Sequence, residues 1–147
     1  MIVPDLNLLV YAYSDSDPRH AAARAWWEAC LNGDEPVGLA WVTMLGFVRL
    51  TTHRQVLVRP LAVTTATGVV EEWLEQPIVR VLVPGRDHAN HCFGFLKKLG
   101  VAGNLTTDAH LAALALEYQA ELHSTDTDFA RFAGLRWRNP LEQKKPK

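Results

Sequence analysis

The chain has 147 residues, of which 48% are hydrophobic and 21% are charged. This length predicts one globular domain with a core of its own and excludes two domains of ordinary size. Fifteen basic and sixteen acidic residues give a formal net charge of -1, so the molecule as a whole has no field that would attract a polyanion. A nucleic acid would have to be held by a local site.

Charged residues are unevenly distributed along the chain. Residues 1–35 hold six acidic and two basic residues, whereas the last seventeen residues hold six basic residues and one acidic residue. An acidic beginning and a basic end would suit a metal site and a phosphate-binding rim, but a lysine-rich terminus is more often a solubilising tail. We therefore predict one domain over residues 1–140 and a basic tail over residues 141–147.

Cysteine usage and hydropathy indicate a cytoplasmic protein. Cys30 and Cys92 match neither a disulfide framework nor a C-x-x-C spacing, so we expect reduced, buried thiols. No apolar run approaches the roughly 18 residues of a membrane span, and no basic stretch precedes an apolar one at the N-terminus. We expect no contact with a membrane.

Strand patterns alternate with helical patterns along the whole chain, and several of them are bounded by Gly, Pro, Asn or Asp. The expected strands lie at 2–3, 37–40, 78–83, 121–124 and 135–137. The expected helices lie at about 6–13, 21–31 after an Asp17-Pro18 cap, 41–52, 64–75, 87–99 up to Gly100, and 106–118, with a helical turn within 126–132. Such alternation predicts an α/β fold in which a parallel sheet lies between helices.

Aspartates occur at related places in this pattern. Asp5 ends the first strand, Asp108 opens a helix, and Asp126 with Asp128 follows the strand at 121–124. Sites in open α/β sheets form beyond the carboxyl ends of the strands, so these carboxylates could meet there and bind Mg²⁺ or Mn²⁺, which prefer hard oxygen ligands. Asp is also common at helix caps and turns, and spacing alone leaves both interpretations open.

Three segments share a pattern with one known family. They read D-L-N-L-L-V-Y-A from Asp5, D-A-H-L-A-A-L-A from Asp108 and S-T-D-T-D-F from Ser124. In this order they resemble the D-x-N-x-L-x-Y-A, D-A-x-x-A-A-x-A and T-x-D-x-D-F segments of VapC-type PIN domains. Each match is short, but the ordered set is specific and covers residues 3 to about 140.

The resemblance implies a PIN fold, a short and mainly parallel sheet between helices in three α/β/α layers. It implies that Asp5, Asp108 and Asp126 are catalytic carboxylates that bind Mg²⁺ or Mn²⁺, with Asp128 as a supporting acid and Asn7 as a further polar candidate. It also implies hydrolysis of RNA phosphodiester bonds by metal-bound water. The implied partners are a VapB-type antitoxin, whose C-terminal segment covers the acidic site, and a second copy of the chain in a homodimer.

One position departs from the family pattern. The family usually carries a Glu on its third helix, where this chain has Gly46. A glycine inside a helix costs roughly 1 kcal/mol relative to alanine, which suggests close packing at this position and leaves the number of metals, one or two, open. Thr43 could offer a hydroxyl on the same helical face and Arg49 could face a phosphate. We expect Gly46→Glu to restore a ligand.

Other groups of residues favour structural roles. Asp87, His88 and His91 have a metal-like spacing but are more often capping and surface residues. His110 and His123 flank the acidic segments as candidates for proton transfer or substrate contact, and His110 should point away from Asp108. A serine hydrolase and a Gly-rich phosphate loop are excluded because their motifs are absent.

The five tryptophans suggest a partner surface in addition to a core. Trp26 and Trp27 cannot both face inward from one helix, and tryptophan is common at interface anchors. We expect an apolar groove between the second and third helices that accepts an amphipathic helix of the antitoxin.

Two other functions stay open beside the ribonuclease toxin. The absence of the usual Glu is compatible with a catalytically weakened PIN-like module that binds RNA or a partner. The same fold could also serve a housekeeping PIN nuclease that acts on DNA or processes RNA.

Overall fold

The computed structural model describes residues 1–142, which form a five-stranded sheet of order β3-β2-β1-β4-β5 with every neighbouring pair parallel. The strands are β1 (Ile2–Pro4), β2 (Val37–Ala40), β3 (Val79–Leu82), β4 (Glu121–His123) and β5 (Trp137–Arg138). All four residues of β2 are buried, as expected for a strand covered on both faces. The predicted parallel sheet is confirmed.

The helices lie close to their predicted positions. They are α1 (Leu6–Tyr13), α2 (His20–Leu31), α3 (Trp41–Thr51), α4 (Val63–Glu75), α5 (His88–Leu99), α6 (Leu105–Glu117) and the short 3-10 helix η1 (Thr127–Arg131). Gly100 ends α5 in the left-handed conformation, with φ 71°, as its position predicts. The predicted cap of α2 is wrong, because Asp17 binds the backbone N–H and guanidinium of Arg19 and α2 begins only at His20.

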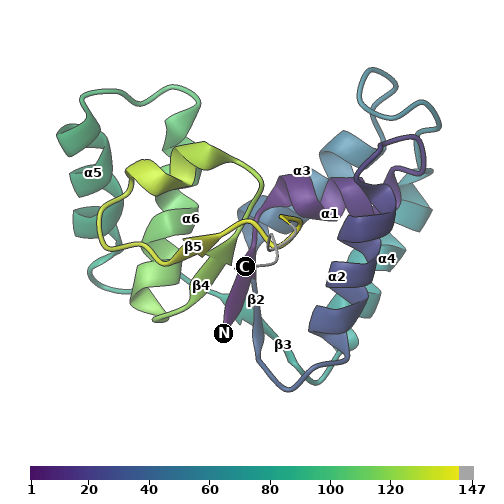
Figure 1. Cartoon of the computed structure of the whole chain (residues 1–147), viewed down its shortest axis with the longest axis horizontal. Helices are drawn as coiled ribbons and strands as arrows, with labels where there is room; N and C mark the ends of the chain where they lie inside the picture. The colour runs from purple at the N-terminus through teal and green to yellow at the C-terminus, as the bar shows by residue number, and fades with distance from the viewer. Residues whose placement is uncertain (143–147) are drawn as a thin grey trace, which may run out of the picture.

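Helices cover both faces of the sheet in three layers. Figure 1 shows α5 and α6 on one side and α1 to α4 on the other. The first layer packs on Val3, Leu122 and Phe129. The layer of α1 to α4 packs on Leu39 and Val79. Its own core includes an aromatic cluster, in which the centroids of the Phe47 and Trp73 rings lie 4.7 Å apart. This arrangement confirms the predicted α/β/α architecture.

The order of the strands places a topological switch at the centre of the sheet. The chain leaves β1 for β2 on one side, and only much later adds β4 on the other side of β1. In such sheets a crevice opens where the connections diverge, beyond the carboxyl ends of the strands. The crevice here lies beyond Pro4 and His123, which are paired in the sheet.

The predicted tail lies mostly outside the described residues. Leu141, its first residue, is partly buried against the helices on the α1 to α4 side, and residues 143–147 lie outside the described part of the chain. Within residues 1–142, no helix is both long enough and apolar enough to span a bilayer.

Candidate functional site

Asp5 stands at the carboxyl end of β1 and also caps α1. Its Oδ1 accepts a hydrogen bond from the Leu6 N–H at 2.7 Å, and its Oδ2 accepts one from the Ser124 hydroxyl at 2.6 Å. Burial raises the pKa of the Asp5 carboxyl, and these two hydrogen bonds oppose that rise in part. The capping interpretation and the site interpretation are therefore compatible, since one oxygen serves the helix and the other faces β4.

Ser124 links the two strand ends that form the crevice. It is completely buried directly after β4, where its hydroxyl donates to Asp5 and accepts from the Asp126 N–H at 2.9 Å and from Asn7 Nδ2 at 3.3 Å. Sequence reasoning considered this serine only as a hydrolase nucleophile and missed its positioning role. Its place at the start of the S-T-D-T-D-F segment was the available signal.

Asp126 and Asp128 share the turn that follows β4. Asp126 caps η1, with its Oδ1 accepting a hydrogen bond from the Asp128 N–H at 2.8 Å. Asp128 is half exposed and lies 3.8 Å from the Arg131 guanidinium. The charge of Asp126 acts on Asp5, and the two line the same groove, while Asp128 stands at the exposed rim of the site.

Asp108 lies in the first turn of α6 and faces the other acids. Its pKa is raised to about 6, first by burial and then by the negative charges of Asp5, Asp126 and Asp128. Repulsion of this kind requires the four carboxyl groups to lie near one another. The fold thus brings together the aspartates that are distant in sequence.

The four carboxyl groups lie near one another but do not form a complete set of metal ligands in residues 1–142. Within residues 1–142, no three His, Cys, Asp or Glu side chains are close enough to hold a metal ion as they stand. Like charges separate when no cation lies between them, and Asp5 and Asp126 each bind a backbone N–H. Asn7 Oδ1 is buried and accepts no hydrogen bond from the described residues. Carboxylate and amide oxygens of this kind suit Mg²⁺ or Mn²⁺.

Gly46 of α3 packs directly against the start of α1. A Cβ atom at this position would lie 2.6 Å from Leu6 Cδ2, so a side chain fits only if Leu6 moves. Gly46, Arg49 and Thr107 line one shallow groove of about 240 Å³ beside Asp108. Thr43 is only 2% exposed and is not part of that groove. Leu6 thus occupies the space that a side chain at position 46 would need, and a metal-facing role for position 46 stays a prediction.

The histidines form structural hydrogen bonds. His88 binds Glu117 through Nδ1 and His110 through Nε2, both at 2.8 Å, so α5 is tied to α6. His91 is exposed, in agreement with the favoured surface role, whereas Asp87 stands at the start of α5 without a side-chain capping hydrogen bond. His123 accepts a hydrogen bond from the Trp26 indole at 3.1 Å and contacts Glu121 at 2.8 Å.

The tryptophans and the apolar groove differ in part from the prediction. The expectation that Trp26 and Trp27 cannot both face inward is wrong. Their ring centroids lie 5.7 Å apart, Trp27 is buried, and the half-buried Trp26 packs on the same core and donates to His123. The expected groove between α2 and α3 is wrong, because α1 packs between these helices. An apolar groove of about 370 Å³ lies instead along α1 and the end of α3, and reaches Asp5 and Asp126 at one end.

Comparison with known proteins gives the family. The family profile described as "PIN domain" matches residues 2–135. The chain belongs to the PIN-domain family. A relative named ribonuclease VapC33, from Mycobacterium tuberculosis, is 48% identical over 97% of this chain and all of its own length. Ribonuclease VapC37 of the same organism is 40% identical over 95% of this chain and 97% of its own length. The resemblance to VapC-type PIN domains is confirmed.

Solved structures share the PIN fold at low sequence identity. The VapBC-1 structure from nontypeable Haemophilus influenzae covers 97% of this chain with a TM-score of 0.68 and 22% identity; the match spans all of that chain. Mycobacterium tuberculosis VapC20 covers 92% with a TM-score of 0.67 and 18% identity, over 99% of its own chain. These structures confirm the fold class.

Proposed function

We propose that this chain is a divalent-metal-dependent endoribonuclease that acts as the toxin of a type II toxin–antitoxin pair in the cytoplasm. The observation that carries the proposal is the grouping of Asp5, Asp108, Asp126 and Asp128, in which burial and then the charges of the other three carboxylates raise the pKa of Asp108. The names of the full-length relatives supply the reaction, since they are called VapC ribonucleases. Fold similarity alone would not specify it.

We assign the metal to Asp5, Asp108 and Asp126, with Asp128 at the rim. When bound there, Mg²⁺ or Mn²⁺ would supply an activated water and neutralise charge on the scissile phosphate. Ser124 holds the Asp5 carboxylate and the Asp126 backbone in place through two hydrogen bonds. These contacts fix two of the acids before a cation arrives, which reduces the reorganisation that binding requires.

Three neighbouring residues complete the proposed site. The unpartnered Asn7 Oδ1 is available to the cation or to a water molecule. Arg49 is exposed beside Thr107, where its guanidinium can contact an RNA phosphate. Thr43 is buried one turn from Gly46, and we assign it a supporting role within α3.

The proposed partners are RNA, a VapB-type antitoxin and a second copy of the chain. The apolar groove along α1 ends at Asp5 and Asp126, so an antitoxin segment lying in it would cover the acids. We expect expression of the chain alone to stop bacterial growth and co-expression of its antitoxin to restore it. The homodimer stays a prediction that sedimentation of the purified chain would test.

RNA cleavage by the purified protein tests the enzymatic proposal. We expect cleavage with Mg²⁺ or Mn²⁺, none with EDTA, and a loss of at least about a hundredfold in Asp108→Asn. Asp34→Asn, an exposed carboxylate before β2, serves as the control and should retain full activity.

A catalytically weakened binding module is the second candidate. Two observations favour this module. Leu6 fills the space beside Gly46, where the family usually has a Glu. Within residues 1–142, no three acidic side chains are close enough together to hold a metal ion. Retained RNA binding without divalent-dependent cleavage would favour this module over the nuclease.

A further inference from the structure

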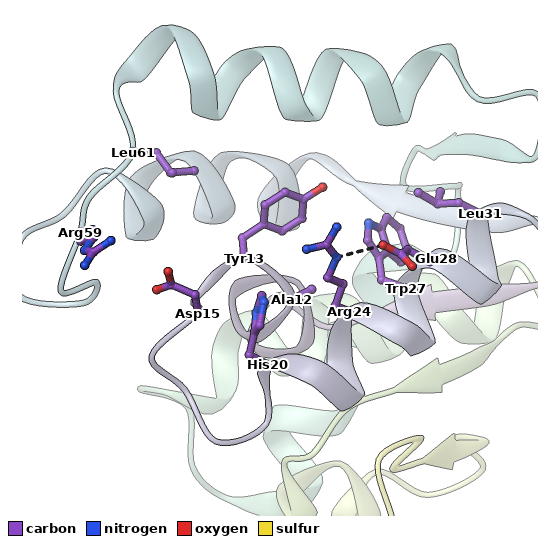
Figure 2. Close-up of a pocket in the computed structure, with 10 residues that line it drawn as sticks. All are labelled: Ala12, Tyr13, Asp15, His20, Arg24, Trp27, Glu28, Leu31, Arg59 and Leu61. Carbon is purple, nitrogen blue, oxygen red and sulfur yellow. Dashed lines mark hydrogen bonds and ion pairs between the residues drawn. The ribbon is translucent and has the colours of Figure 1, made fainter.

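A separate cavity lies at the far end of α1 from the acids. It has a volume of about 430 Å³ and is bounded by α1, α2 and the segment that leads into α4. Figure 2 shows its side chains, with Tyr13 and Arg24 near the middle and Arg59 at one end. α1 has eight residues, so about 12 Å of helix separates its two ends. The volume is within the range of small-ligand pockets.

The indole N–H of Trp27 is a buried donor without a partner at this cavity. Trp27 is 2% exposed, and its Nε1 donates to no acceptor in residues 1–142. In Figure 2 this nitrogen lies on the edge of the ring that faces Tyr13 and Arg24. Buried donors in folded proteins are nearly always satisfied, so an acceptor is missing here.

Two further donors face the same end of the cavity. Tyr13 Oη accepts from the Trp73 indole at 3.3 Å, which leaves its own O–H to donate. Arg24 Nε donates to Glu28 Oε1 at 2.9 Å, which leaves the terminal guanidinium nitrogens for a second acceptor. The charges of Arg24 and Glu28 both act on the Tyr13 hydroxyl, whose pKa is raised mainly by burial. Trp27, Tyr13 and Arg24 therefore each have a donor that no side chain of the described residues accepts from.

The other lining groups restrict the charge and shape of a ligand. Leu31, Leu61 and the ring of Tyr13 provide apolar walls. Glu28 and Asp15 also line the cavity, together with Arg24 and Arg59, so the four charges cancel and the lining has no excess of positive charge for a dianion such as phosphate. A singly charged carboxylate can accept from all three donors while adding one negative charge.

We propose that this cavity binds a monocarboxylate with an apolar body, and that the Trp27 indole, the Tyr13 hydroxyl and the Arg24 guanidinium donate to its carboxylate. The carboxylate belongs either to a free small molecule or to an acidic side chain of a bound protein. The site has no residue in common with the acidic site and does not depend on nuclease activity.

Indole N–H signals in a ¹⁵N-labelled sample provide the test. The chain has five tryptophans, and Trp27→Phe assigns the Trp27 signal. We expect benzoate to move the Trp27 signal downfield and to bind about tenfold more tightly than its neutral analogue benzamide. Arg24→Gln should weaken benzoate binding by about tenfold, and Arg86→Gln, a change at an exposed arginine outside the cavity, should leave it unchanged.

A second probe separates the two sources of the carboxylate. N-acetyl-L-glutamate methylamide mimics an acidic side chain of a protein; if it binds at least as tightly as benzoate, a protein partner is indicated, and weaker binding indicates a small molecule. The proposal is overturned if neither probe moves the Trp27 signal, or if Arg24→Gln binds benzoate as tightly as the parent. Should Trp27→Phe fail to fold, the exposed Arg24 variant and the benzamide comparison still decide.

Discussion

Burial and three neighbouring carboxyl groups raise the pKa of Asp108. Its folded pKa of about 6 lies above the value of about 3.9 expected for an unfolded chain. The proton on Asp108 therefore favours the folded state. This contribution is complete below about pH 4 and is lost as the pH rises through about 6.

Asp108→Asn should accordingly stabilise the metal-free protein at neutral pH. We expect a gain of about 1 kcal/mol at pH 7.5, limited because water screens this half-buried group, and almost none at pH 4. Urea denaturation in EDTA at both pH values measures it, with Asp34→Asn as the control. A variant less stable than the parent at pH 7.5 would show that the negative charge of Asp108 mainly stabilises the first turn of α6.

Leu6 and Gly46 form a matched pair beside the site, since the side chain of one occupies the space left by the other. Gly46→Glu alone should lose about 1–3 kcal/mol through overpacking, and less in a Leu6→Ala background. A double-mutant cycle by urea denaturation gives the coupling, and Mn²⁺ titration should show tighter binding in the double variant than in Leu6→Ala. Equal costs in both backgrounds would mean that position 46 does not face Leu6.

Two further glycines, Gly68 and Gly38, lie in opposite surroundings. Gly68 of α4 has open space where a Cβ would lie, whereas a Cβ on Gly38 of β2 would lie 2.8 Å from the Leu82 side chain of β3. The first is a conformational cost to α4, and the second lets β2 and β3 pack closely.

Alanine should therefore have opposite effects at these two glycines. Gly68→Ala should stabilise the protein by about 0.5–1 kcal/mol, and Gly38→Ala should destabilise it by about 1–3 kcal/mol. Thermal unfolding of both variants measures the difference. A loss of stability in Gly68→Ala would contradict the open surroundings of α4.

The elements were predictable because their signals are local. Alternation of apolar runs with Ala- and Leu-rich helices identifies strands and helices from neighbours in sequence, as at β2 and α6. The groove was misplaced because sequence does not show that α1 lies between α2 and α3. The hydrogen bonds of Ser124 and of His88 with Glu117 join residues that are distant in sequence, and only the packed fold reveals them.

At the scale of the whole molecule, the affinity of the proposed site for a divalent metal should depend on pH. Because protons compete with the cation for Asp108, Mn²⁺ should bind about threefold to tenfold more weakly at pH 5.5 than at pH 7.5. Isothermal titration at the two pH values measures this ratio, which should shrink in Asp108→Asn. Equal affinities in the parent would remove Asp108 from the ligands.

The position of β1 between β2 and β4 also has a consequence for protein synthesis. A chain growing on the ribosome presents Asp5 first, Asp108 after most of the domain, and Asp126 only after β4 has emerged. Until then one edge of β1 has no strand beside it, and an unpaired edge readily joins another chain. The nascent protein therefore passes through a period in which this edge is open to pairing and Asp126 and Asp128 are still missing from the site.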